Sequence, residues 1–276
     1  MPVEFSISLK TNVTAESVES PQLAAAAAAG FKYFEWCRDL VSEPILYDKP
    51  LADTLQSLTQ RYGIRLGSVH GFASTPAGKA YTKEICLTAN INRLEFLDRM
   101  GGRVLVMHLP LTDHPDIDTA VAEATAILEG LWPTCERTGV RVAVENLFQP
   151  NQFGVEFFDR LLEHFPPDYV GFCYDSGHAL ISGWADVLDR HGERLIATHL
   201  ADNDGKEDLH WVPGKGGVDW ATVIPAVKRS ALCRADGKRN GPGPIGLEVR
   251  LPKTEPIDTI VQDSYNAITE LWDKHG

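Results

Sequence analysis

The stretch LTANINRLEFLDRMGGRVLVMH, residues 87–108, holds the pattern that decides the fold. From Leu87 to Leu97 its apolar residues recur three or four positions apart, which places them on one face of a helix. Gly101 and Gly102 end that helix, and the short apolar run RVLVMH follows. A helix, a glycine turn and a buried strand that ends in a histidine form one structural unit.

The same unit recurs along the chain. Helical stretches end at Gly30, Gly63 and Gly139, and each leads into a short apolar run. Near-continuous apolar strands are buried on both faces, as in a parallel sheet covered by helices, and eight such βα units close into a barrel. Eight runs are present, namely MPVEFSISL, FKYFEW, IRLGSVH, RVLVMH, RVAVEN, YVGFCYD, RLIATHL and PIGLEVRL.

The sequence therefore predicts an α/β fold of the (β/α)8 TIM barrel type. The alternative is an open doubly wound sheet. The first strand is not followed by the G-x-G-x-x-G motif of dinucleotide-binding sheets, and eight similar units exceed the usual number of strands in an open sheet. The barrel is therefore favoured.

Length and composition fit one large domain. The chain has 276 residues, of which 43% are hydrophobic and 23% charged, an ordinary globular composition, and we expect a single TIM-barrel domain over residues 1–276. No apolar run is long enough to span a membrane and the N-terminus lacks signal-peptide features, so we expect a cytoplasmic protein with no membrane partner. Five cysteines without a C-x-x-C pair do not indicate a disulfide framework. A homo-oligomer is left open.

Residues of metal-ligand type stand at the ends of seven successive strands. The active site of a TIM barrel is built from the carboxyl ends of its strands, so these side chains meet at one mouth. Many like charges in one place require a cation, and mixed imidazole and carboxylate ligands suit Mn²⁺ or Zn²⁺. We therefore predict a divalent metal site of one to three ions at this mouth, where the seven strand-end residues are Glu35, His70, His108, Glu145, Asp175, His199 and Glu248.

Two neighbouring segments extend this site. His178 follows Asp175 by three residues in YDSGHA, where a small Ser-Gly step lets the chain turn so that both side chains face the mouth. Asp208 and His210 stand two residues apart in the polar loop after the seventh strand. In extended chain such residues point the same way and can chelate one ion.

Other residues are candidates for substrate contact. Lys215, between two glycines, can neutralise an oxyanion or phosphate of the substrate. Phe34, Trp36 and Trp211 offer apolar faces to a sugar ring. We expect Glu35 to lie beside Trp36 in the substrate-binding part of the mouth.

At these residues the sequence resembles the xylose isomerase-like TIM barrel superfamily, which holds sugar isomerases and epimerases, inosose dehydratase-like proteins and endonuclease IV. The resemblance covers essentially the whole chain and is most specific in VENL, YDSGHA, THLADNDGKEDLHWVPGKGGVDW and GLEVR. In its ketose 3-epimerase branch, a quartet on strands five to eight holds one divalent metal and a nearby histidine binds substrate. The resemblance implies that His178 is this histidine and that the quartet is Glu145, Asp175, His199 and Glu248.

The endonuclease IV branch holds three zinc ions with a larger ligand set, and all of its members have counterparts in this chain. The resemblance implies a second metal held by His70, His108 and Glu145. It implies a third metal held by His178, Asp208 and His210. The ligand set alone therefore does not choose the reaction.

We predict a divalent-metal-dependent isomerase or epimerase that acts on a sugar or sugar-derived small molecule. The metal acidifies the C–H next to a carbonyl, so that one carboxylate takes the proton and another returns it. The epimerase resemblance implies that Glu145 and Glu248 are this catalytic pair. That branch usually carries an arginine in the loop after strand seven, and none stands between His199 and Trp220, so substrate recognition differs from that branch.

Two alternatives use the same site. One is an endonuclease IV-like, multinuclear zinc phosphodiesterase, and the other is a metal-dependent lyase or dehydratase. A net charge of −12 makes nucleic acid a disfavoured partner. The basic residues in the loops after strands two and three are also diluted by acidic ones; they are Arg38, Lys49 and Lys79, beside Asp39, Glu43 and Asp48.

Overall fold

The computed structural model of the chain describes residues 3–37, 46–72, 83–111, 114–148, 153–184, 186–234, 243–251 and 254–275. Helices and strands alternate along these residues, as the repeated unit predicts. The first half of the chain contains β1 (Phe5–Leu9), α1 (Pro21–Ala29), β2 (Tyr33–Trp36), α2 (Lys49–Tyr62), β3 (Arg65–His70), α3 (Lys83–Met100), β4 (Val104–Met107), α4 (Ile117–Thr138) and β5 (Arg141–Glu145). The second half contains α5 (Gly154–His164), β6 (Val170–Asp175), α6 (Ser176–Ser182), α7 (Val187–His191), β7 (Leu195–His199), α8 (Trp220–Arg229), β8 (Ile245–Leu247) and α9 (Ile257–Lys274).

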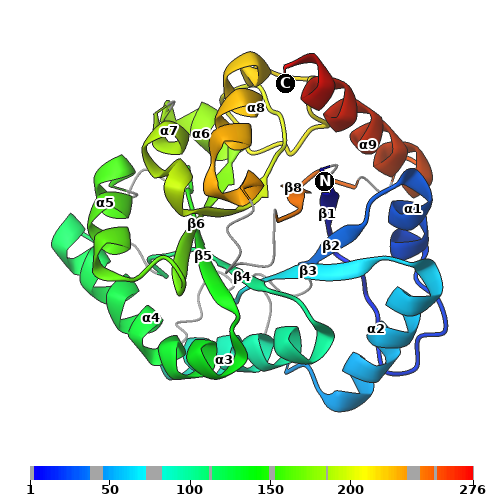
Figure 1. Cartoon of the computed structure of the whole chain (residues 1–276), viewed down its shortest axis with the longest axis horizontal. Helices are drawn as coiled ribbons and strands as arrows, with labels where there is room; N and C mark the ends of the chain where they lie inside the picture. Colours follow the sequence, from blue (N-terminus) through cyan, green and yellow to red (C-terminus); the bar gives the residue numbers. More distant parts are fainter. Residues whose placement is uncertain are drawn as a thin grey trace.

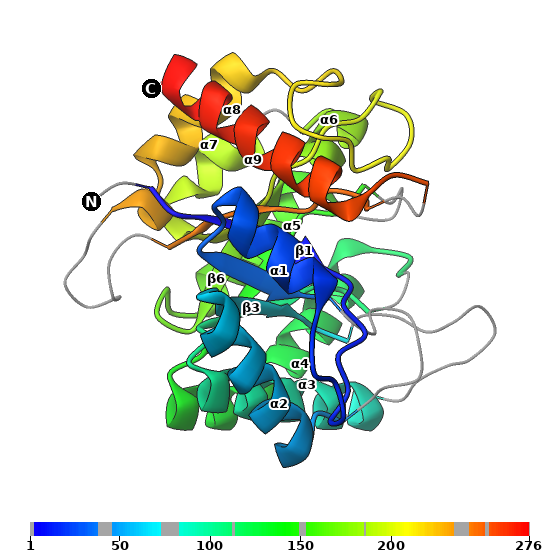
Figure 2. The same ribbon diagram turned by 90° about the vertical axis from the view of Figure 1, so that its right-hand side faces the viewer.

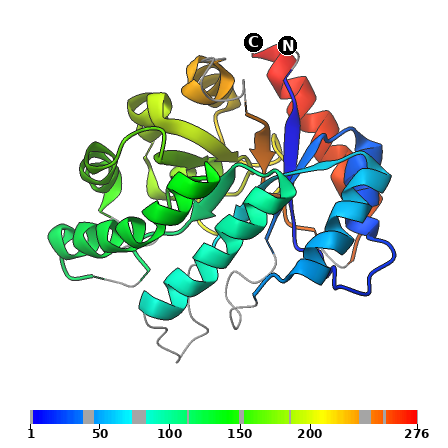
Figure 3. The same cartoon turned by 60° about the horizontal axis from the view of Figure 1, so that its bottom comes forward.

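The eight strands form one parallel sheet with each strand beside its neighbour in sequence. β8 pairs with β1, and an isolated parallel bridge from Leu200 to Leu247 joins β7 to β8, which brings the sheet round on itself. The helices surround this barrel as an outer layer (Figure 1, Figure 3). The (β/α)8 TIM barrel is thus confirmed, and the doubly wound sheet is excluded.

The helix boundaries follow from local sequence. The Asp48 and Asp116 side chains accept hydrogen bonds from backbone N–H groups in the first turns of α2 and α4. Gly63 and Gly139 end the same helices with φ of 69° and 70°, a left-handed conformation that glycine adopts without steric cost. Each glycine cap turns the chain into the next strand.

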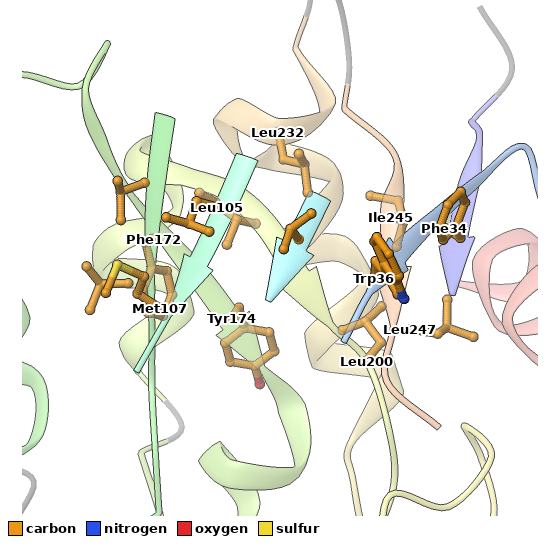
Figure 4. Close-up of a cluster of buried hydrophobic side chains, with 14 of the residues drawn as sticks. Phe34, Trp36, Leu105, Met107, Phe172, Tyr174, Leu200, Leu232, Ile245 and Leu247 are labelled. Carbon is orange, nitrogen blue, oxygen red and sulfur yellow. The ribbon is translucent and has the colours of Figure 1, made fainter. Parts of the chain in front are cut away.

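The main core lies between the sheet and the helices. Outward-facing strand side chains such as Leu105, Met107 and Phe172 are buried there, as the close-up in Figure 4 shows. α1 and α9 lie side by side over the strands that close the barrel (Figure 2). Each fully buried leucine of this layer contributes roughly 1.5–3 kcal/mol through the hydrophobic effect.

The barrel interior is built from smaller side chains. Val104, Val106 and Ala143 form an apolar cluster inside it with Cys173, Ile196 and Ala197. The register then places the strand ends beside one another, because Asp175 of β6 pairs with His199 of β7. This convergence at the carboxyl end of the barrel positions the candidate site.

None of the helices among the described residues is both long enough and apolar enough to cross a membrane. All five cysteines are free, and four of them are buried.

Candidate metal centre

The predicted quartet comes together at the carboxyl end of the barrel. Glu145, Asp175, His199 and Glu248 each offer one ligand atom, and these atoms all lie within 4.8 Å of one another. His199 Nδ1 lies 3.1 Å from Glu145 Oε2 and 3.1 Å from Glu248 Oε2. All four residues are buried. Three anionic side chains and one imidazole therefore surround a single point.

The orientation of these atoms fits a metal ligand set. Although the atoms are close, neither oxygen of Glu145 has a hydrogen-bond partner among the described residues, and the same holds for Asp175 Oδ2 and His199 Nδ1. Buried polar atoms in proteins are normally hydrogen-bonded. Side chains that approach one another without bonding are aimed at a common point, which is where a cation would neutralise them.

A second group of ligand type shares Glu145. His70 Nε2 and His108 Nε2 lie 3.6 Å and 3.2 Å from Glu145 Oε2. The three ligand atoms lie within 4.8 Å of one another. The structure therefore brings together the residues that the endonuclease IV resemblance assigns to a second metal.

The third predicted group is more open. Asp208 lies between two imidazoles, with Oδ2 2.9 Å from His210 Nε2 and Oδ1 3.6 Å from His178 Nε2. The other ring nitrogens face backbone carbonyls, since His178 Nδ1 lies 2.8 Å from Asn146 O and His210 Nδ1 lies 2.9 Å from Glu248 O. Although burial would lower it, the Asp208 carboxylate raises the pKa of His210 to about 9, so in this arrangement both ring nitrogens of His210 donate. Once the Nε2 proton is lost, the carbonyl keeps the proton on Nδ1 and Nε2 can bind a metal.

The electrostatics of the cluster keep its two glutamates ionised. Burial would raise the pKa of Glu145, but the imidazoles of His199 and His108 outweigh it and hold this pKa well below its usual range. The pKa of Glu248 is also lowered, because the effect of the His199 imidazole outweighs that of burial. In contrast, burial raises the pKa of Asp175 to about 6.

Glu35 does not lie at the rim, where the sequence analysis placed it. β2 runs on to Trp36, and the register shift between β2 and β3 sets Glu35 opposite Ser68, whose hydroxyl donates to Glu35 Oε2 over 2.8 Å. Glu35 Oε1 lies 2.9 Å from His199 Nε2, on the other side of that ring from the quartet. Glu35 therefore lies behind His199 inside the barrel, close to its ring but without a hydrogen bond to it among the described residues, and its predicted direct contact with substrate does not fit this position.

Trp36 and Phe34 also lie elsewhere than expected. Both are fully buried on the outer face of β2 (Figure 4). The Trp36 ring stacks on Tyr47 at 5.0 Å, and its Nε1 donates to Thr11 O. Strand alternation explains the error, because an inward Glu35 forces both aromatic neighbours into the outer core. The substrate role expected for Trp36 is therefore withdrawn.

The glycines around Lys215 have a structural explanation. The Asp202 carboxylate accepts hydrogen bonds from Gly214 N, Val218 N and Trp220 Nε1, which folds the loop onto itself. A Cβ at Gly216 would lie 2.4 Å from Asp202 Oδ1, so this position has no room for a side chain. Gly214 and Gly216 are therefore explained by the close packing of this loop around Asp202.

Lys215 itself is exposed and stands outside the three ligand groups. Together with Trp211, His210 and Arg250, it lines a cavity of about 480 Å³ beside α9, which borders the third ligand group at His210. Trp211 is exposed, as expected of an aromatic face. Because His210 lines the same cavity, the expected contact of Lys215 with a substrate oxyanion stays a prediction.

Two residues of the site escaped the sequence analysis. Asn146 bonds both backbone groups of Asp175, since its Oδ1 accepts from Asp175 N and its Nδ2 donates to Asp175 O. Phe148 is partly exposed and its ring lies 5.0 Å from that of His178. Asn146 directly follows Glu145 and Phe148 stands two residues further on in ENLF, and this proximity is the signal that could have identified them.

The basic loop residues are only partly described. Lys49 begins α2 and pairs with Asp53. Arg38, Asp39, Glu43 and Lys79 lie outside the described residues.

Comparison with curated proteins gives partial matches. The chain is 35% identical over 146 residues to the uncharacterized protein y4fM of Sinorhizobium fredii, covering 49% of this chain and 46% of that protein. It is 26% identical over 166 residues to an inosose dehydratase of Geobacillus thermodenitrificans, covering 48% and 55% of the two proteins. The chain thus spans about half the length of these two relatives.

Solved structures match over nearly the whole chain. The IOLI protein with a binding zinc atom superposes with a TM-score of 0.76 at 16% identity, covering 99% of both chains. D-allulose 3-epimerase from Methylomonas sp. superposes with a TM-score of 0.69 at 18% identity, covering 97% and 96% of the two chains. At this level of identity the similarity shows the fold. Residues 23–270 match the family described as xylose isomerase-like TIM barrel, and the chain belongs to this family.

Proposed function

We propose that the protein is a divalent-metal-dependent isomerase or epimerase that removes a proton next to a carbonyl of a sugar or sugar-derived molecule. The observation that carries this proposal is the approach of two buried glutamates to one ring nitrogen, since Glu145 Oε2 and Glu248 Oε2 each lie 3.1 Å from His199 Nδ1. They stand on β5 and directly after β8, where a substrate in the mouth would lie between them.

The quartet Glu145, Asp175, His199 and Glu248 would hold the ion, whose charge would make the C–H next to a bound carbonyl more acidic. Either glutamate can accept that proton, because both carboxylates are ionised near neutral pH. The other glutamate, once protonated, can return a proton to the opposite face or to the neighbouring carbon. The first outcome is epimerisation and the second is isomerisation.

Neighbouring side chains suit a polyhydroxylated substrate. His178 is held by Asn146 O and by Asp208, so its ring has a fixed orientation for a substrate hydroxyl. Phe148 beside it offers an apolar face to a sugar ring. Similar proteins named D-allulose 3-epimerase and inosose dehydratase support a carbohydrate as the substrate class.

The test is proton exchange with solvent. We would load the protein with Mn²⁺ or Zn²⁺, incubate it with a panel of ketoses and inososes in D₂O, and follow deuterium incorporation by NMR. Exchange at a carbon next to the carbonyl, with an epimer or isomer as product, supports the proposal. Absence of exchange with every member of the panel would contradict it.

Phosphodiester hydrolysis is the second candidate, and the His70, His108 and Glu145 group favours it. A phosphodiesterase should contain two or three zinc ions per chain and cleave DNA at abasic sites. Both results together would favour phosphodiester hydrolysis over isomerisation or epimerisation. Dehydration shares the same initial proton removal. Loss of water from an inosose in the D₂O experiment would identify a dehydratase instead.

A further inference from the structure

A cavity of about 510 Å³ opens at the amino end of the barrel, opposite the metal centre. It begins among the first residues of the strands and reaches inward as far as Glu35 and His199. Cavities of roughly 300–1,000 Å³ are typical of small-molecule sites. None of the functions proposed above uses this space.

The cavity exists because the interior is underfilled on one side. TIM barrels usually fill this region with branched residues such as valine, isoleucine and leucine, but here its walls include Ser6, Gly67, Ser68 and Gly246. The barrel is also loosely closed at this end. β7 and β8 meet through a bridge at Leu200, beyond the carboxyl end of β7, and β8 is only three residues long.

One wall of the cavity carries a hydroxyl that lacks a partner. Ser6 is 3% exposed, and within the described part of the chain its Oγ has no hydrogen-bond partner. Burial of such a group without a bond is unfavourable. Ser68 adds a second hydroxyl, which donates to Glu35 Oε2 and keeps its acceptor capacity. Both groups suit a ligand with hydroxyls of its own.

The mouth of the cavity is rich in arginine. Arg65, Arg103 and Arg141 stand at the starts of three consecutive strands, β3 to β5, and all three line it. Arg65 lies over the Tyr33 ring at 4.2 Å and 3.2 Å from Glu4 Oε1. Within the part of the chain that the structure describes, the other charged residues at the mouth are Arg234, which pairs with Glu193, and Asp168. Positive charge is in excess, and guanidinium groups bind oxyanions in bidentate geometry.

We propose that this amino-end cavity is a second ligand site, which takes a small polyhydroxylated molecule with one oxyanion group, either phosphate or carboxylate. The oxyanion lies at the arginine mouth, because the Glu35 carboxylate at the deep end repels it. The hydroxyls point inward to Ser6 and Ser68. Because the deep end touches Glu35 and His199, an occupant is placed to act as an effector of the metal centre.

The test measures binding without turnover, so it is independent of the proposed reaction. Calorimetric titrations of the full-length protein would use glycerol 3-phosphate, glycerate, glycerol and inorganic phosphate, each before and after metal removal with a chelator. We expect one glycerol 3-phosphate or glycerate per chain, bound about tenfold or more tightly than glycerol. Binding should persist when the metal is removed, and any shift in its affinity should equal the shift in metal affinity that the ligand causes, because coupling between two sites is reciprocal.

Variants locate the site. Ser6→Leu fills the cavity and should abolish binding, while Arg103→Met should weaken it about tenfold from an exposed position that does not threaten folding. Arg160→Met, on the outer helix α5, removes the same charge and should leave binding unchanged. Binding that is unaffected by Arg103→Met, or that disappears with the metal, would overturn the proposal, as would failure of all four probes to bind.

Discussion

The two ends of the barrel carry side chains of opposite charge. At the carboxyl end, Glu145, Asp175 and Glu248 converge on one point and require a cation. At the amino end, Arg65 and Arg141 line a cavity with hydroxyl groups and suit an anion. Both ends are built from the same strands. The difference teaches that a parallel barrel keeps its inward-facing layers apart, so one fold can hold two sites of opposite charge.

The largest expected effect tests whether chemistry belongs to the carboxyl end alone. Glu145→Gln should lower turnover by about a thousandfold, because it removes a carboxylate that acts both as ligand and as base. Circular dichroism should show an intact fold. The matched control is Glu129→Gln, the same change at an exposed position on α4, which should leave turnover unaltered. Unchanged turnover in Glu145→Gln would remove this residue from the mechanism.

Glu35 lies on the boundary between the two ends. Glu35→Gln should weaken metal binding roughly 10- to 100-fold, because a carboxylate behind a ligating histidine orients the ring and raises its basicity. A titration of the metal-free variant with Zn²⁺ would measure this, and Glu35→Asp should restore part of the affinity. A merely structural role predicts a lower melting temperature with no change in metal affinity.

The junction between β7 and β8, where the barrel closes, can be tested through stability. A Cβ at Gly246 would lie 2.3 Å from Thr198 O, so Gly246→Ala should push β8 away from β7 and cost about 2 kcal/mol. Gly192→Ala is the control, because its Cβ would meet only ordinary contacts at 3.7 Å. Thermal unfolding should separate the two variants by several degrees. Equal melting temperatures would mean that β7 and β8 can move apart enough to accommodate the methyl group without loss of stability.

The smallest expected effect concerns the number of metals at the carboxyl end. If one ion serves an isomerase, His70→Ala should change turnover by less than about threefold, since His70 lies outside the quartet. Metal content, measured by mass spectrometry, should remain at one ion per chain. Loss of an ion together with loss of activity would show a multinuclear centre and favour phosphodiester hydrolysis.

Much of the architecture could be predicted because it depends on local patterns. The helix over Lys83–Met100 and the strand after Gly102 follow from apolar spacing and a glycine turn. The candidate ligands could also be named, since a residue that ends a strand is visible in the sequence. Their convergence follows from the barrel, because parallel strands end on one side.

Other features depended on contacts between distant segments. The position of Glu35 opposite Ser68 depends on a register shift between β2 and β3, and the burial of Trp36 depends on its packing against Tyr47 and Phe96. The role of Asp202 depends on a loop that returns to it from Gly214 to Trp220. Contacts between segments so far apart in the sequence cannot be predicted from its helix or strand periodicity.

The sequence by itself determined the repeated unit, the barrel and the chemical types of side chain at the strand ends. The tertiary structure decided which of those side chains approach a common point, which one stands behind a ligand, and where the interior remains hollow. The physical reason is the sequence separation over which the interactions act. Helix and strand periodicity act over a few residues, whereas register and barrel closure depend on how eight strands fit together.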